Sequence, residues 1–331
     1  MTESLEHAPS NAMLTRSITE DEIATFQRDG VVVLRDVYPL AWVDRLRVAM
    51  DEVFARSPTP SITTATRTGT SHEGSRTDMV ARALSMIAED RGQGLAIQDG
   101  HMPVGRCIVE TDACSWHAGL RDHHINGPLP ELVAALTDSR KVSLYSDQLF
   151  LKEPGSSVRT PWHQDKPYWV MQGEKVAVCW VPVDVVTIES GAMGYVIGSH
   201  RWGQTFKLSD FITDTGTYPA VGGIEFDDLS NLPAIDAEPD RFEVRRFEAG
   251  PGDVIVHHWM TLHGSTGNVS ATKIRRAASV RYAGEDVTYL RRGSSPEPFR
   301  HWVTLKDGDP LERDSRFPIV WPRGQAGDRS A

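Results

Sequence analysis

The sequence has few cysteines, no excess of basic residues and no long apolar run, and each absence argues against a class of protein. Three cysteines occur among 331 residues, and none has CxxC spacing. We therefore expect neither a disulfide framework nor a cysteine-based zinc site, and we expect a reducing compartment. Lys and Arg number 35 against 45 Asp and Glu, which gives a formal net charge of -10. This balance disfavours nucleic acid or an anionic membrane as the main partner.

The chain also lacks the common targeting signals. No stretch approaches the roughly 18 consecutive apolar residues of a membrane span, and residues 1–17 contain no apolar signal region. The last residues, GDRSA, match no address or lipidation motif. We expect a cytoplasmic protein that acts on a small molecule, without nucleic acid or membrane; the sequence does not indicate its oligomeric state.

Helical patterns are concentrated near the N-terminus. Thr19 and Glu22 have capping-box spacing before an apolar run, and Gly30 suits the end of that helix. Residues 31–34, VVVL, predict a short buried strand. Apolar residues recur at helical spacing over 41–54, so a second helix is expected there.

Beyond residue 140 the pattern changes to short alternating segments separated by turn residues. Four of these segments predict strands: 141–152, 174–186, 252–258 and 274–283. Such a series is typical of an antiparallel sandwich or barrel, so we expect a mainly β core with a helical N-terminal layer. Residues 57–78, rich in Ser, Thr, Pro and Gly, predict a surface loop or an active-site lid, and 205–250 predict a long excursion from the barrel.

The segment TPWHQDKPYW (160–169) contains the first candidate site. In an extended strand His163 and Asp165 would point to the same face, which is compatible with a metal site, an acid/base pair or a simple hydrogen bond. His263, in TLHGSTGN, follows a strand-like run and offers a third ligand. Two imidazoles and one carboxylate form the facial triad of non-haem Fe(II) oxygenases, although a zinc hydrolase uses the same ligand types.

The predicted strand IRRAASVRYA presents arginine on both of its faces. Arg275 and Arg281 share one face and Arg276 lies on the other. A buried arginine requires an anion, and its planar guanidinium matches a carboxylate. A bound dicarboxylate on an inward face and an exposed strand edge are both compatible with this pattern.

With these residues in place, the chain resembles the phytanoyl-CoA dioxygenase family of Fe(II)- and 2-oxoglutarate-dependent oxygenases. The resemblance extends over most of the chain and is carried by five segments in the family's order: ITEDEIATFQRDGVVVLRDV, DQLFLKEPGSSVRTPWHQDKPYW, VCWVPVDVVTIESGAMGYVIGSHRWG, GDVIVHHWMTLHGSTGN and RRAASVRY. It implies a double-stranded β-helix (jelly-roll, cupin-like) core at about 141–290. Helices and lid elements would occupy about 15–140 and a C-terminal extension 291–331, all within a single domain.

The resemblance assigns roles by position. The metal ligands would be His163, Asp165 and His263. Arg275, which begins the R-R-A-x-S run, would hold 2-oxoglutarate, with Arg276 as the neighbouring alternative. Three further residues match cosubstrate-pocket positions: Ser265, Gln148 and Trp180. Because Asp165 is present, halogenation, which needs a small residue there, is disfavoured.

The implied reaction consumes Fe(II)-bound 2-oxoglutarate and O2 and releases succinate and CO2 while hydroxylating an unactivated C–H bond. Desaturation, epoxidation or cyclisation by the same chemistry, and a non-catalytic binding module of the same fold, are the alternatives. We favour a small, non-CoA metabolite as substrate, although basic clusters at 67–76 and 289–301 would suit a CoA ester. Candidate substrate contacts are Lys152, Trp169 and Arg281.

Overall fold

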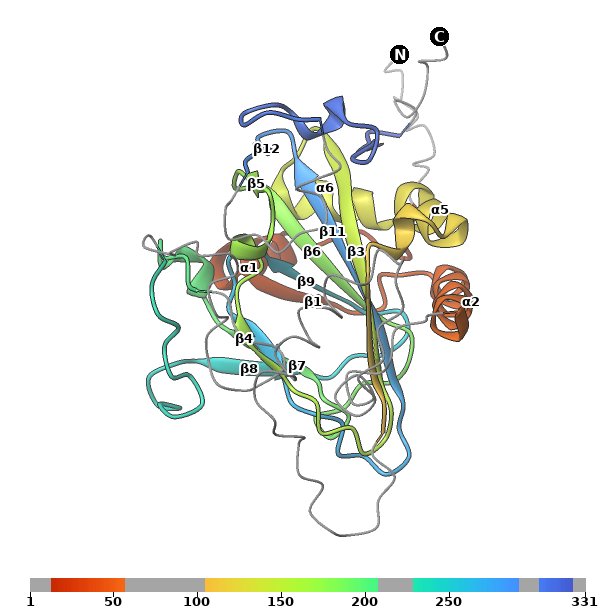
Figure 1. Ribbon diagram of the computed structural model, residues 1–331, viewed down its shortest axis with the longest axis vertical. Helices are drawn as coiled ribbons and strands as arrows, with labels where there is room; N and C mark the ends of the chain where they lie inside the picture. The colour runs from red at the N-terminus through yellow and green to blue at the C-terminus, as the bar shows by residue number, and fades with distance from the viewer. Residues whose placement is uncertain (1–12, 57–104, 208–228, 292–303, 324–331) are drawn as a thin grey trace, which may run out of the picture.

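Two antiparallel sheets form the centre of the protein (Figure 1). The computed structural model describes residues 13–56, 105–207, 229–291 and 304–323. Within these ranges the larger sheet has seven strands in the order β1-β9-β6-β11-β3-β13, with β2 also paired to β3. Its strands are β1 (Val31–Leu34), β2 (Cys107–Thr111), β3 (Val142–Lys152), β6 (Val176–Pro182), β9 (Val254–His258), β11 (Arg275–Gly284) and β13 (Ile319–Trp321).

The smaller sheet has the order β4-β10-β7-β8. It consists of β4 (Thr160–His163), β10 (His263–Ser265), β7 (Met193–Val196) and β8 (Val244–Phe247), and a separate two-stranded ribbon pairs β12 (Thr288–Tyr289) with β5 (Met171–Gln172). Trp180 and Ile255 of the larger sheet pack with Met193 and Tyr195 of the smaller sheet in one buried cluster. The two sheets therefore enclose a common interior, and the predicted double-stranded β-helix is confirmed.

Helices cover the opposite face of the larger sheet. They are α1 (Glu20–Asp29), α2 (Leu40–Arg56), α5 (Ala118–Asn126) and α6 (Leu129–Thr137). Short 3-10 turns occur elsewhere along the chain: η1 (Ala113–Ser115), η2 (Lys166–Tyr168), η3 (Ser199–Arg201) and η6 (Leu311–Arg313). Val43 and Leu46 of α2 share a buried cluster with Val181 and Val256 of the sheet. In Figure 1, α2 and α5 lie to one side of β3 and β11, with β4, β7 and β8 on the other.

The predicted start and end of the first helix are confirmed. The Thr19 side chain accepts a hydrogen bond from the Glu22 N–H, and the Glu22 carboxylate accepts one from the Thr19 N–H. Gly30 then ends the helix with φ 74°, in the left-handed region that glycine adopts without strain. The next residues enter β1 directly, as the VVVL pattern indicated.

Two predicted boundaries need correction. The segment 205–250 is not wholly an excursion, because its last part forms β8, which pairs with β7 and covers that edge of the smaller sheet. The larger sheet also extends beyond 141–290, since β1, β2 and β13 pair with its strands. The predicted loop at 57–78 lies outside the described residues. In the described ranges, no helix combines the length and hydropathy needed to cross a membrane.

Candidate metal centre

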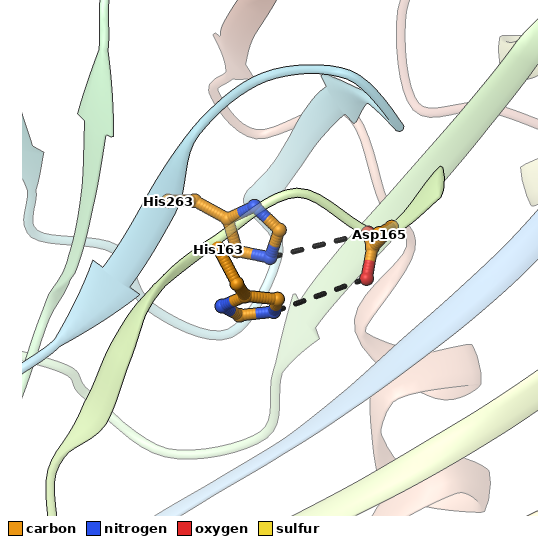
Figure 2. A group of neighbouring side chains, drawn as sticks. All are labelled: His163, Asp165 and His263. Carbon is orange, nitrogen blue, oxygen red and sulfur yellow. Dashed lines mark ion pairs between the residues drawn. The ribbon is translucent and has the colours of Figure 1, made fainter. Parts of the chain in front are cut away.

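The three predicted metal ligands converge inside the smaller sheet (Figure 2). His263 of β10 pairs directly with His163 of β4, and both imidazoles point toward the Asp165 carboxylate. The two histidine Nε2 atoms lie 4.0 and 3.9 Å from the Asp165 carboxylate oxygens. All three side chains are buried. One donor atom from each residue lies within 4.8 Å of the other two, which is the spacing that a single ion between them requires.

Backbone carbonyls fix the tautomer of both imidazoles. His163 Nδ1 lies 2.8 Å from the Pro161 carbonyl, and His263 Nδ1 lies 2.9 Å from the Thr261 carbonyl. Because a carbonyl only accepts, each Nδ1 carries the proton and each Nε2 presents a lone pair to the centre. Burial lowers the pKa of both histidines, so both are neutral at neutral pH, as metal ligands must be.

Asp165 reaches the centre from a turn rather than from the expected continuous strand. β4 ends at His163, and Asp165 precedes the 3-10 turn η2. Its N–H donates to the Trp259 carbonyl at 2.9 Å, which holds the turn against the end of β9. Burial by itself raises the pKa of Asp165, but the imidazoles of His263 and His257 outweigh that effect and keep the pKa below its usual range.

His257 of β9 is a further histidine at this centre. Its Nε2 donates to the second Asp165 oxygen at 3.2 Å, and its ring centroid lies 4.4 Å from that of His263. The residue is buried, and its Nδ1 has no hydrogen-bond partner among the described residues. His257 therefore holds the Asp165 carboxylate in place, as hydrogen-bonding partners of metal ligands commonly do.

Arg275 lies on the interior face of the larger sheet. Its guanidinium is 1% exposed, stacks 5.0 Å from the Trp180 ring and donates from Nη2 to the Met193 sulfur at 3.2 Å. No carboxylate pairs with it among the described residues, and its Nε has no partner. Burial lowers the pKa of Arg275 to about 10, so the group remains charged at neutral pH. A buried, uncompensated guanidinium is costly unless an anion binds it.

Arg276, the alternative anchor, points the other way. It pairs with Asp184 at 2.8 Å and also with Asp51 of α2. Its charge is thus neutralised between the larger sheet and the helical layer. Of the two neighbouring arginines, only Arg275 lacks a carboxylate partner among the described residues.

A second buried cation lies beside Arg275. Lys152 of β3 pairs with Arg275 across the sheet and donates to the Ser265 hydroxyl and the Thr266 carbonyl, both at 3.0 Å. Burial, reinforced by the charge of Arg275, lowers the pKa of Lys152 to about 7. Lys152, predicted among the substrate contacts, lies beside Arg275 and Ser265 in the structure.

Gln148 lies away from that group. Its amide oxygen accepts from Arg281 Nη2 at 2.8 Å, and its amide nitrogen donates to Thr111 at 3.2 Å. Arg281 also stacks 4.9 Å from the Trp169 ring. Gln148 was predicted to line the cosubstrate pocket. In the structure it lies beside Arg281 and Trp169, which were predicted to contact the substrate.

Sequence reasoning missed two residues of this interior. His257 was not among the predicted site residues; it lies on β9, whose end holds the turn that carries Asp165. Tyr195 was not singled out. Its ring centroid lies 5.9 Å from that of His263, and its buried hydroxyl has no partner among the described residues. The alternation of β7, MGYV, places Met193 and Tyr195 on one face, which is the only sequence signal for either.

Comparison with known proteins gives a family and a fold. The model of the family "Phytanoyl-CoA dioxygenase (PhyH)" matches residues 26–277. A phytanoyl-CoA dioxygenase of Arabidopsis thaliana is 23% identical over 304 residues, covering 86% of this chain and 98% of that protein.

Two solved structures have the same fold. The epimerase SnoN in complex with Fe3+, alpha ketoglutarate and nogalamycin RO superposes with a TM-score of 0.60 at 19% identity, over 91% of this chain and 98% of that one. EctD from S. alaskensis with 2-oxoglutarate and 5-hydroxyectoine superposes with a TM-score of 0.58 at 17% identity, over 92% of this chain and 88% of that one.

A double-stranded β-helix with two histidines and one carboxylate at its interior is the arrangement of the non-haem iron oxygenases. The chain belongs to the phytanoyl-CoA dioxygenase family, whose members are iron- and 2-oxoglutarate-dependent oxygenases.

Proposed function

We propose that this protein is an Fe(II)- and 2-oxoglutarate-dependent dioxygenase that hydroxylates an unactivated C–H bond of a small metabolite. The reaction consumes 2-oxoglutarate and O2, inserts one oxygen atom into the substrate and leaves succinate and CO2. The observation that carries this proposal is the buried, uncompensated guanidinium of Arg275 in the same interior as the histidine–carboxylate triad. A dicarboxylate that chelates the metal at one end satisfies both features.

The residues present fit both groups. His163, Asp165 and His263 would hold the iron, which supplies O2 activation when bound. Arg275 and Lys152 would hold the distal carboxylate of 2-oxoglutarate, with Ser265 adding a hydrogen bond and Trp180 covering the guanidinium. The hydroxyl of Tyr195 and the Nε of Arg275, which have no hydrogen-bond partner in the described part of the chain, are donors that such an anion would satisfy.

The chain's own contribution is orientation and exclusion of water. The two carbonyl-bound Nδ1 protons keep both Nε2 lone pairs directed at the metal. The apolar residues between the sheets keep the centre buried, which strengthens each charge–charge contact.

Other outcomes of the same chemistry are a second candidate. Desaturation, epoxidation or cyclisation needs the same ligands and cosubstrate, and a solved relative of similar fold is an epimerase. The substrate that we propose is a non-CoA metabolite processed in the cytoplasm by this single oxygenase domain. The basic clusters that would suit a CoA ester lie largely outside the described residues.

Anaerobic titration of the apo-protein with Fe(II) and 2-oxoglutarate tests the proposal. A weak visible charge-transfer band is expected in the wild type and should be absent in His163→Ala. Admission of O2 should then release succinate. A zinc hydrolase would give no band, and a non-catalytic module would give a band without succinate. Either result, or a band that persists in His163→Ala, would contradict the proposal.

A further inference from the structure

The interior holds a third buried cation, Arg281 of β11, whose partners are all uncharged. Its side chain is 6% exposed. Nη1 donates to the Ser146 hydroxyl at 3.2 Å and Nη2 to the Gln148 amide oxygen at 2.8 Å, while the guanidinium lies 4.9 Å from the centroid of Trp169. Its Nε has no partner, and no carboxylate pairs with it in the part of the chain that the structure describes.

Asp112, an acidic group whose pKa senses Arg281, does not neutralise this charge. Asp112, which precedes η1, lies within the electrostatic reach of Arg281 but forms no ion pair with it. Burial and the neighbouring Asp147 raise the pKa of Asp112 to about 7, and Arg281 only partly opposes that rise. Asp147 itself accepts hydrogen bonds from His124 and the Cys114 N–H on the other side of β3. Arg281 therefore lacks a committed counter-ion.

Arg281 and Arg275 serve different ends of the interior. They lie on the same face of β11, six residues apart, which is about 20 Å between their Cα atoms at 3.4 Å per residue. A five-carbon diacid held by Arg275 is far shorter than that separation. Arg281 nevertheless lies toward the metal centre, because Trp169, against which it stacks, directly follows η2, the turn that Asp165 precedes. The Trp169 ring centroid also lies 6.1 Å from that of Trp259, whose carbonyl accepts the Asp165 N–H. A second anion, distinct from the cosubstrate, is needed to satisfy the Arg281 guanidinium.

We propose that Arg281 binds a carboxylate of the primary substrate, so that the oxidised C–H bond lies between this carboxylate and the metal centre. The inference rests on the proposed function. The unpaired Nε–H together with a neighbouring Nη–H forms a fork that matches a carboxylate. Ser146 and Gln148 fix the rest of the guanidinium, and the ring of Trp169 adjoins it. One cation balances a monoanion, so a carboxylate fits better than a doubly charged phosphate ester.

The test titrates the preformed anaerobic Fe(II)·2-oxoglutarate complex, at saturating 2-oxoglutarate, with matched probes. Hexanoate is compared with hexanamide, phenylacetate with phenylacetamide, and phenyl phosphate serves as the dianion. Shifts of the charge-transfer band report binding near the metal without turnover. We expect the wild type to bind at least one carboxylate about tenfold or more tighter than its amide. In Arg281→Gln that preference should vanish while the band itself remains.

Gln148→Glu is the second variant. It places a carboxylate beside the Arg281 guanidinium, and because the two groups would form an ion pair, the variant should fold. It should also lose the preference for carboxylates. Arg245→Gln is the matched control and should keep the preference for carboxylates. It removes a half-exposed arginine that pairs with Asp29 and Glu243.

Equal binding of acids and amides by the wild type, preference for phenyl phosphate, or an unchanged preference in Gln148→Glu would overturn the inference. Loss of the band in Arg281→Gln would also overturn it. A wild type without any band would instead overturn the proposed function, so the two failures are distinguishable.

Discussion

The face of the sheet to which a side chain points decides which partners it has. Neighbouring residues on one strand illustrate this. Arg275 and Arg276 differ only in the face to which they point, yet one is uncompensated in the interior and the other is neutralised by two aspartates. His257 and His258 divide in the same way, since His257 donates to Asp165 and His258 donates to the Glu174 carbonyl.

Arg275→Met should weaken 2-oxoglutarate binding without destabilising the apo-protein. One charge-assisted hydrogen bond is worth about 1.5–3 kcal/mol, which corresponds to roughly 10- to 100-fold in Kd. Removing an uncompensated buried charge should leave the free energy of unfolding unchanged or raised. Calorimetry and denaturant unfolding measure the two effects. Arg276→Met should show the reverse, with lower stability and normal cosubstrate affinity; equal effects in both variants would contradict the assignment.

Binding of 2-oxoglutarate should take up a proton through Lys152. With a pKa of about 7 in the ligand-free protein, Lys152 is largely neutral at pH 8, and an incoming anion raises that pKa toward its usual range. Of the groups facing it, Arg275 and Arg159 lower the pKa of Lys152 and Cys107 raises it, while burial raises the pKa of the Cys107 thiol itself.

Apparent affinity should therefore fall as pH rises above about 7, by up to about tenfold per unit. Calorimetry at pH 8 in buffers of different ionisation enthalpy should detect uptake approaching one proton. Lys152→Met should abolish it; uptake that persists in this variant would assign the proton to another group.

His257→Phe should lower iron affinity by about 10- to 100-fold, the usual effect of removing a partner of a metal ligand. The Asp165 carboxylate would lose the donor that holds its second oxygen. Competition against a chelator gives the affinity. His258→Gln is the control on the opposite face of β9, and a similar loss there would indicate a general packing effect.

At the scale of elements, the pairing of β4 with β10 brings together the two histidines of the candidate metal centre. His263 lies opposite His163 in this pair, and Gly264 allows the two backbones to approach. A Cβ at Gly264 would lie 2.8 Å from the Thr160 carbonyl oxygen and 3.2 Å from the Trp162 nitrogen. Both contacts are with backbone, so relief requires the strands to separate.

Gly264→Ala should consequently reduce both stability and iron affinity, with a cost in stability of about 1–3 kcal/mol, as in other overpacked sites. Urea unfolding and chelator competition measure these quantities. Gly250→Ala is the matched control, because a Cβ there meets only a Val185 methyl at 4.0 Å. Wild-type iron affinity in Gly264→Ala would show that the spacing of the two strands does not set the ligand geometry.

Across the whole molecule, the two sheets contribute different parts of the centre. The smaller sheet and the turn after β4 carry the proposed metal ligands, whereas β3 and β11 of the larger sheet carry Lys152 and Arg275. A bound metal–diacid complex would therefore bridge the sheets across their common interior.

Fe(II) and 2-oxoglutarate together should stabilise the fold more than either alone. A ligand at 100 times its Kd adds about 2.7 kcal/mol to the free energy of unfolding, which should raise Tm by several degrees. Anaerobic thermal unfolding with and without a chelator measures the effect. Asp165→Ala should show no joint stabilisation, and an additive rather than joint shift in the wild type would argue against a bridging complex.

The sequence by itself determined the periodic strands and the capped first helix, and it indicated the three residues that cluster at the candidate metal centre, because alternation, capping residues and the HxD spacing are local patterns. Only the tertiary structure showed that Arg275 faces the interior while Arg276 pairs with aspartates, that Lys152 contacts Ser265, and that Gln148 contacts Arg281. It also showed that β1, β2, β8 and β13 pair with strands of the two sheets. Those outcomes depend on which strands pair and in which register, and therefore on contacts between residues far apart in the chain.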